Sequence, residues 1–399
     1  MFKEDIDLIN KFHEERGHSE GSKKTYKHSI KLFTEYHNTS LTHLINEALE
    51  EQEKEVPTHK LKVYDRLMNF RTQYLIPTRV GNSVGGIERK IKTIYKHNRI
   101  HLPYLPPINR KQIKNNPEIS FEDLLTKEEI INGLKYLSKS IKSRILDMVT
   151  GGFAIEETQQ KTVGMFLKGN YTDHYSDDIQ DALEILSKKD NVVTCFNLKR
   201  KKTGVSYYGF CNPETTQLIV EDLLQRNIKS EGESLFRHYK TYVNTITKEV
   251  NDKLNLGTAG GYSRFSPHMF RRYNATFLNQ GQSLEENINL SKNEIDALQG
   301  RAEGATREAY FKSNPIFLKL AYVKAMNNVS LYKQYSYEIV EGKIVIHCID
   351  PKKENKVLKK KVREGEEFVE NLKGDEGLNN YVNLIGEDEF KQRLIEYVS

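Results

Sequence analysis

The segment FSPHMFRR, residues 265–272, is the most informative stretch of the sequence. Ser266 is a good N-cap residue, and Pro267 suits the first position of a helix, where its missing N–H would have no partner anyway. Phe265 and Phe270 have the spacing of a hydrophobic staple across a helix start. The segment therefore predicts a helix that begins at the proline.

Two functional side chains lie within this predicted helix. His268 falls in its first turn, and Arg271 follows three residues later on the same face. Free backbone N–H groups, the positive end of the helix dipole, an imidazole and a guanidinium then converge on one point. Such an arrangement binds anions, most naturally a phosphate. Because HxxR is a common pattern, the alternative is a surface histidine beside a solvated arginine.

A basic turn precedes this segment in the chain. Residues 192–198 and 205–211 are rich in β-formers and predict the two strands of a hairpin. Lysines at a hairpin tip most often serve solubility, but one there can also reach a DNA groove and protonate a leaving oxygen. The basic residues of the turn are Lys199, Arg200, Lys201 and Lys202.

A third segment follows the helix. Leu298-Gln299-Gly300-Arg301 precedes Tyr310, which lies nine residues after the arginine. A tyrosine at helical spacing is ordinarily a core or rim residue. The set as a whole, however, can hold a phosphodiester and attack it, with no metal-ligand cluster and no glycine-rich phosphate loop, so we expect neither a metal nor a cofactor. The set comprises Lys202, His268, Arg271, Arg301 and Tyr310.

Composition sets the frame for these motifs. The chain has 399 residues, with 61 Lys and Arg against 55 Asp and Glu, 37% hydrophobic and 29% charged residues. These values exclude collagen, coiled-coil rods and full disorder. A net charge of +6 permits nucleic-acid binding without predicting it. With no signal-peptide core, no run of ~20 apolar residues and three cysteines without CxxC spacing, we expect a reduced, cytoplasmic protein with no membrane partner.

Length and pattern predict at least two domains of mainly α structure with small β-hairpins, the α+β class. Helical periodicity predicts a helical core DNA-binding domain over residues 1–102. Residues 103–119 contain four prolines, which a long helix cannot accommodate, and so predict a linker. A larger domain that carries the motifs above follows over 120–330, and a tail with a further hairpin follows over 331–399.

Basic residues in three places are candidates for contact with a DNA backbone, although a solvated surface is the alternative for each. The candidates are Lys90 and Lys92 in a helix predicted over 86–97, Arg110, Lys111 and Lys114 in the linker, and Lys199, Arg200 and Lys201 at the hairpin tip.

Together these motifs resemble those of the tyrosine recombinases, the phage-integrase family, with the character of its archaeal or viral members. That family has a lysine in a KTG hairpin turn, an HxxR box, and a nucleophilic tyrosine nine residues after the last residue of an LxGH or LxGW box. The matches here are Lys202-Thr203-Gly204, His268 to Arg271, and Tyr310. The run from Ser22 to Phe33 resembles the family's core-binding helices. The resemblance covers about residues 20–325 and implies a helical core-binding domain joined to a tyrosine-recombinase-like catalytic domain.

Two positions depart from the family pattern. Arg301 stands where the family has His or Trp, and an arginine there can still donate hydrogen bonds to a phosphate. In the first box, residues 151–157 align with GxRxxE so that Glu157 matches its acidic position, but Ala154 replaces the arginine. One phosphate clamp of the family is therefore missing.

The resemblance implies a site-specific recombinase or integrase that cuts and rejoins duplex DNA through a 3′-phosphotyrosine, as a homotetramer on DNA. Tyr310 would be the nucleophile, Arg271 and Arg301 would hold the phosphate, Lys202 would protonate the leaving oxygen, and His268 would serve as acid and base. With Ala154 in the first box we expect cleavage to be impaired. The alternatives are a non-catalytic DNA-binding relative, a type IB topoisomerase, and a helical scaffold whose motifs are coincidental.

Overall fold

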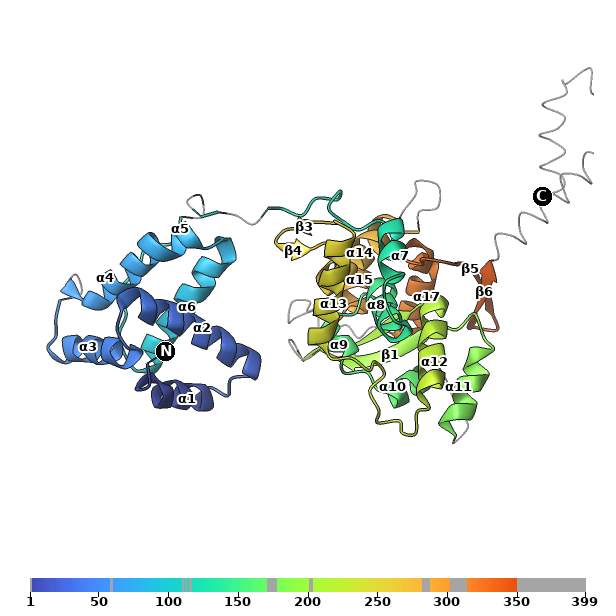
Figure 1. Ribbon diagram of the computed structural model, residues 1–399, viewed down its shortest axis with the longest axis horizontal. Coiled ribbons are helices and arrows are strands. Elements are labelled where there is room, and N and C mark those ends of the chain that lie inside the picture. Colours follow the sequence, from blue (N-terminus) through green and yellow to red (C-terminus); the bar gives the residue numbers. More distant parts are fainter. Residues whose placement is uncertain are drawn as a thin grey trace, which may run out of the picture. The chain divides into compact units, whose positions relative to one another are not determined.

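A computed structural model gives the architecture of the chain (Figure 1). The residues that it describes are 2–57, 60–109, 111, 113–114, 117–170, 178–200, 204–281, 288–301 and 314–349. They are mainly helical, with strands only in short antiparallel pairs, which is the predicted α+β class. They divide into two compact units, the first made of residues up to 119 with 259–261, and the second of residues 120–258 with those from 262 onward.

The first unit is a helical bundle. Its elements are α1 (Asp5–Glu15), α2 (Glu20–His37), α3 (Leu41–Glu53), α4 (Lys62–Asn69), the π-helical segment η2 (Phe70–Leu75), α5 (Ile76–Thr78) and α6 (Gly81–His97). Phe33 of α2 packs edge-on against Phe70 and Tyr95 in its core. A buried ion pair, Arg71 to Glu88 at 2.7 Å, joins η2 to α6.

The second unit contains the predicted catalytic residues that the structure describes. Its helices are α7 (Lys127–Leu134), α8 (Lys139–Gly151), α9 (Ile155–Thr158), α10 (Val163–Asn170), α11 (Ile179–Ser187), α12 (Pro213–Arg226), α13 (Lys240–Lys253), α14 (Pro267–Gln280), α15 (Lys292–Leu298), α17 (Pro315–Ala325) and the 3₁₀ turn η4 (Met326–Asn328). Its hairpins are β1 (Thr194–Lys199) with β2 (Ser206–Cys211), and β5 (Gln334–Val340) with β6 (Lys343–Ile349). A short pair, β3 (Thr258–Ala259) and β4 (Tyr262–Ser263), lies between α13 and α14.

Helix α14 begins at Pro267, as the sequence predicts, and Ser266 is its N-cap residue. The predicted staple is confirmed, because the rings of Phe265 and Phe270 pack edge-on with centroids 4.9 Å apart. The expected cap by the serine side chain is wrong, since Ser266 Oγ is buried without a hydrogen-bond partner among the described residues. Packing of the two phenylalanines, rather than a side-chain cap, therefore fixes this helix start.

Other helix starts follow local signals in the sequence. Asn212 caps α12 by accepting a hydrogen bond from Thr215 N at 3.1 Å. Thr126 and Glu129 form a complete capping box at α7. Helix α2 begins at Glu20, two residues before the predicted start, because Ser19 supplies the cap. These caps place the helices around the core without help from distant residues.

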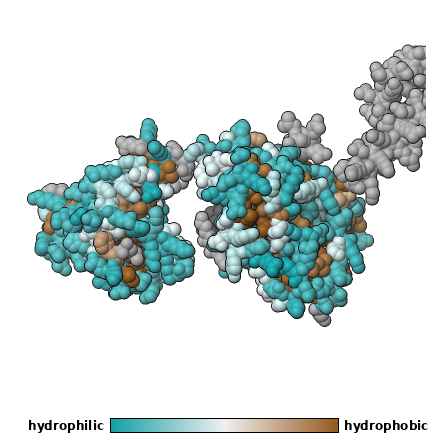
Figure 2. All heavy atoms as spheres, viewed as in Figure 1, coloured by the Kyte–Doolittle hydropathy of each residue, from teal (hydrophilic) through white to brown (hydrophobic). Residues whose placement is uncertain are grey.

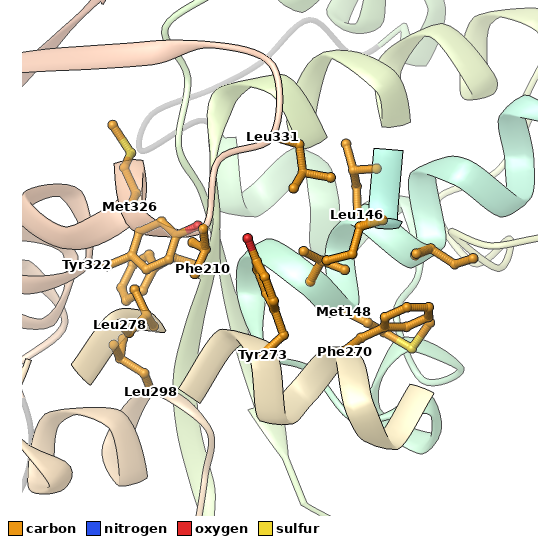
Figure 3. Close-up of a cluster of buried hydrophobic side chains, with 14 of the residues drawn as sticks. Leu146, Met148, Phe210, Phe270, Tyr273, Leu278, Leu298, Tyr322, Met326 and Leu331 are labelled. Atoms are coloured by element: carbon orange, nitrogen blue, oxygen red, sulfur yellow. The ribbon is translucent and has the colours of Figure 1, made fainter. Parts of the chain in front are cut away.

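The described residues of the second unit form two buried hydrophobic clusters, and the one in Figure 3 joins α8 and α14 to β2 and α17. Leu146 and Met148 of α8 pack with Phe270 and Tyr273 of α14, and Phe210 of β2 stacks on Tyr322 of α17 at 5.8 Å. Helix α14 is therefore anchored along its buried side. On the face in Figure 2, hydrophilic residues cover most of each unit, and hydrophobic residues gather in small patches. Within the described residues, no helix is long and apolar enough to cross a membrane.

A buried ion pair lies in the second unit between α8 and α10. Lys161 Nζ is 2.7 Å from Asp147 Oδ2, and both side chains are 0% exposed. The same ammonium lies 3.1 Å from the ring centroid of Phe153 and 3.7 Å from that of Phe196. Removing one charge from such a pair leaves the other buried and uncompensated, which is costly, whereas removing both need not be.

We predict that Lys161→Met lowers the free energy of unfolding by about 3–5 kcal/mol, and that Lys161→Met combined with Asp147→Leu recovers most of the loss. Urea unfolding of the full chain, followed by circular dichroism, measures both. A double variant as unstable as the single one would show that packing, not the unpaired carboxylate, dominates.

Candidate anion-binding site

The site is built around the Glu157 carboxylate, which is 2% exposed. Glu157 lies in α9, whose N-cap residue is Ala154. Its Oε2 accepts hydrogen bonds from Ala154 N at 2.7 Å and from Arg271 Nη1 at 2.8 Å. Its Oε1 forms an ion pair with Arg200 Nε at 3.0 Å, without the alignment of a hydrogen bond. One buried carboxylate thus holds two guanidinium groups, one on each oxygen.

Arg271 comes from the second turn of α14 and is mostly buried, with 11% of its side chain exposed. Its Nη2 donates to the carbonyl oxygen of Gln299 at 2.5 Å. Burial lowers the pKa of the guanidinium, and Glu157 opposes that shift. A guanidinium is not deprotonated in proteins, so Arg271 keeps its positive charge and the site contains a fixed cation.

Arg200 follows the last residue of β1 and has 21% of its side chain exposed. Its Nη1 donates to the carbonyl oxygen of Gly300 at 3.2 Å. Its backbone closes the hairpin turn, because Arg200 N donates to Val205 O and Gly204 N donates to Arg200 O, at 2.8 and 2.7 Å. The start of the basic turn is therefore fixed next to Glu157.

The segment after α15 supplies the carbonyl groups that both arginines use. Gly300 has a φ of +58°, and a Cβ there would lie 2.4 Å from the Tyr207 ring, so only glycine fits. Gln299 is buried, and its Nε2 donates to Asn274 Oδ1 at 2.8 Å. The Asn274 amide in turn donates to the carbonyl oxygens of Val149 and Thr150 at the end of α8.

Arg301 lies at the edge of this cluster. Its Nη2 donates to Gln299 Oε1 at 2.8 Å, and its Nη1 is 3.3 Å from Asp296 Oδ1. Its side chain is 40% exposed, which leaves part of the guanidinium open to solvent. An arginine at this position of the box is therefore held in place by its own segment.

His268 is exposed in the first turn of α14. Its ring packs against Tyr262 with centroids 4.4 Å apart, and Arg272 Nε donates to its Nε2 at 3.4 Å. Partial burial lowers its pKa below 6.5, and the charges of Arg272 and Arg271 lower it further. His268 is therefore neutral at pH 7 and suited to exchange a proton.

The charges in this cluster do not balance. Three guanidinium groups, those of Arg200, Arg271 and Arg301, meet two carboxylates, those of Glu157 and Asp296. Within the described part of the chain, this set therefore has one guanidinium more than carboxylates. Such a cluster attracts a multiply hydrogen-bonding anion such as a phosphate group.

The structure brings together only part of the predicted set. Arg271 and Arg301 lie in the cluster, with Ala154 at its base, and His268 is near enough to Arg271 for that charge to lower its pKa. Predicted residues that lie outside the described part of the chain are Lys202, Tyr310, Lys201 and Arg110.

The candidate DNA contacts differ in how free they are. Lys199 is exposed at the end of β1, and Lys111 and Lys114 are exposed in the segment 103–119, which belongs to the first unit. Lys92 is 2.5 Å from the buried Glu88, so its charge is already paired. Lys90 is half-buried, and its Nζ donates to Gly86 O at 3.4 Å. These contacts with DNA stay predictions, and Lys92 is the weakest of them.

Sequence reasoning placed Arg200 among the DNA contacts of the hairpin tip and missed its ion pair with Glu157. It also missed Gln299 and Asn274, which carry the polar network beneath the arginines. No pattern in the sequence singled out Arg200 from the other basic residues of the turn. No pattern in the sequence marked Asn274 as a link to α8.

Comparisons with known proteins add little. No family model matches the chain, and no curated protein matches it. Among solved structures, a crystal structure of XerA recombinase is similar over 80% of this chain and 97% of that chain, with 14% sequence identity and a TM-score of 0.30. The geometry of the site therefore has to carry the functional interpretation.

We predict that Gly300→Ala destabilises the second unit by about 2–4 kcal/mol, because it adds an overlap with Tyr207 to the strain of a positive φ. Gly342→Ala is the matched control, since Gly342 has a φ of +73° but open space around it. It should cost only about 1–2 kcal/mol. Urea unfolding measures both, and equal losses would show that the ring contact yields without cost.

Proposed function

We propose that this chain is a site-specific DNA recombinase or integrase that cuts and rejoins duplex DNA through a 3′-phosphotyrosine. The observation that carries the proposal is the pairing of Arg200 and Arg271 with one buried carboxylate, with Arg301 beside them, so that among the described residues this cluster has one more guanidinium than carboxylates. A phosphodiester presents two charged non-bridging oxygens, which suits convergent guanidinium donors. Double-stranded DNA is the proposed partner, bound by a homotetramer.

In the proposed reaction Tyr310 Oη attacks the scissile phosphorus and passes its proton to the neutral His268, which serves as the base. The P–O5′ bond breaks as the P–O(Tyr310) bond forms, and Lys202 protonates the leaving 5′ oxygen. A second 5′-hydroxyl then reverses these steps. Each step exchanges one phosphodiester bond for another, so the reaction consumes no nucleoside triphosphate.

Arg271 is the group best placed to stabilise the added charge on the phosphorane. Its guanidinium is fixed by Glu157 and Gln299 before substrate arrives, so little reorganisation is required at the moment of reaction. His268, neutral at pH 7, exchanges protons at the edge of the same site. Arg301, which is partly exposed, assists from the other side of Gln299.

The first test is Tyr310→Phe in the full chain. The DNA site is first identified by selecting the duplexes that the wild-type chain retains from a random pool. The same duplexes, with a nick beside the cleavage position so that the cut strand cannot be rejoined, then serve as substrates. We predict that the wild type forms a covalent adduct that survives a denaturing gel, whereas Tyr310→Phe forms none and binds the duplex with unchanged affinity, because only the nucleophilic oxygen is lost.

Arg271→Ala should lower the rate of adduct formation by roughly 10²–10³, the cost of one lost donor to a transition-state oxyanion. Arg237→Ala, which removes an exposed arginine of the same unit, is the control and should leave the rate unchanged. Specific binding with no wild-type adduct would instead identify a non-catalytic DNA-binding protein. Relaxation of plasmids without regard to sequence would identify a topoisomerase.

A further inference from the structure

We propose that Arg200 supplies the second guanidinium of the phosphate clamp, in the place that Ala154 leaves without one. This inference rests on the proposed function, and it assigns Arg200 to the reacting phosphate rather than to the DNA surface at large. It also replaces the expectation, drawn from Ala154 alone, that cleavage is impaired.

The first argument is the shared carboxylate. Arg200 and Arg271 contact the two different oxygens of Glu157, at 3.0 and 2.8 Å. They also donate to the carbonyl groups of consecutive residues, Gly300 and Gln299. Groups that share one carboxylate and one stretch of backbone necessarily lie close together. The two guanidinium groups are thus held as a pair by elements far apart in the sequence.

The second argument is electrostatic. Two like charges this close repel each other, and a single carboxylate compensates only one of them. A further anion between or beside the pair relieves that repulsion, and a phosphate offers the required geometry because its non-bridging oxygens can accept from both groups.

The third argument concerns free donors. Each guanidinium has five N–H bonds. Among the described residues, Glu157 and Gln299 are the acceptors in contact with Arg271, and Glu157 and Gly300 those in contact with Arg200. Both groups therefore keep donors for a ligand. The exposed 21% of the Arg200 side chain provides access from solvent.

The fourth argument is the position of Ala154. Its backbone nitrogen is 2.7 Å from Glu157 Oε2, so a longer side chain at this position starts beside the same carboxylate. An arginine at position 154 or at position 200 can therefore place its guanidinium beside the Glu157 carboxylate, the first from α9 and the second from the hairpin. The competing explanation is that Arg200 only connects the hairpin to Glu157 and does not bind the ligand. Moving the guanidinium from position 200 to position 154, by combining Arg200→Ala with Ala154→Arg, distinguishes the two explanations.

The experiment compares the full-length wild type with Arg200→Ala, Ala154→Arg, and the combination of both, with Arg237→Ala as the control. The first readout is the affinity for inorganic phosphate, titrated by calorimetry at constant ionic strength. We expect Arg200→Ala to weaken binding at least roughly tenfold, the combined variant to recover to within about threefold, and Arg237→Ala to match the wild type. A thermal melt of each variant checks that it is folded.

The second readout is adduct formation on the selected nicked duplex. We expect Arg200→Ala to reduce the rate by roughly 10²–10³, the combined variant to restore most of it, and Ala154→Arg alone to change it by less than about threefold, because the clamp is already complete. If Arg200 only connects the hairpin to Glu157, an arginine at position 154 would not restore the rate of adduct formation.

Three results overturn the proposal: phosphate affinity unchanged by Arg200→Ala, no rescue by Ala154→Arg in a folded double variant, or a rise of tenfold or more from Ala154→Arg alone. If the wild type forms no adduct on any duplex, the proposed function fails. The phosphate titration then still decides whether Arg200 belongs to an anion site.

Discussion

The arrangement of the site depends on one interaction, the ion pairing of the buried Glu157 carboxylate with two arginines. A carboxylate that is 2% exposed is costly unless hydrogen bonds and opposite charges compensate it. Ala154 N and Arg271 satisfy one oxygen, and Arg200 lies against the other. Burial thus makes the third residue of a four-residue helix the point at which α9, α14 and the β1–β2 hairpin meet.

A second layer of polar contacts keeps this convergence rigid. Gln299 links the segment after α15 to Asn274 of α14, and Asn274 links α14 to the last carbonyl groups of α8. Gly152 ends α8 with a φ of +67°, and a Cβ there would lie 2.2 Å from Asn274 Oδ1. The glycine at this point is therefore required both by the helix end and by the amide beside it. Arg271 is thus fixed through a chain of buried, hydrogen-bonded groups rather than by surface contacts.

Local signals made much of the fold predictable. The pattern Asn212-Pro213 predicts a helix over 213–226 and the structure has one with these bounds, because cap and first-turn proline act within a few residues. The sequence predicts a hairpin over 337–349, and strands 334–340 and 343–349 pair around Glu341-Gly342, where φ is positive at both residues. The bounds of β1 and β2 differ from the predicted 192–198 and 205–211 by at most two residues, and α2 begins at Glu20 because Ser19 supplies its cap.

The site was less predictable, because its contacts join residues far apart in the chain. Arg200 and Glu157 are separated by 43 positions, and nothing in either local pattern states which basic residue of the turn meets the carboxylate. Comparison with the GxRxxE pattern identifies Ala154 at the arginine position, but it contains no signal for a guanidinium that reaches Glu157 from another segment.

A clamp residue on the hairpin has a physical consequence that a helical one lacks. Arg200 is held by two backbone hydrogen bonds that close the turn, from Arg200 N to Val205 O and from Gly204 N to Arg200 O. Lys202, the proposed proton donor, is two positions after Arg200 in the sequence. Under the proposal, phosphate binding by Arg200 and proton transfer by Lys202 therefore depend on one closed hairpin. An arginine at position 154 would instead be positioned by α9, independently of the hairpin. With Ala154 there and Arg200 in the clamp, phosphate binding and proton transfer are coupled through the backbone of the turn.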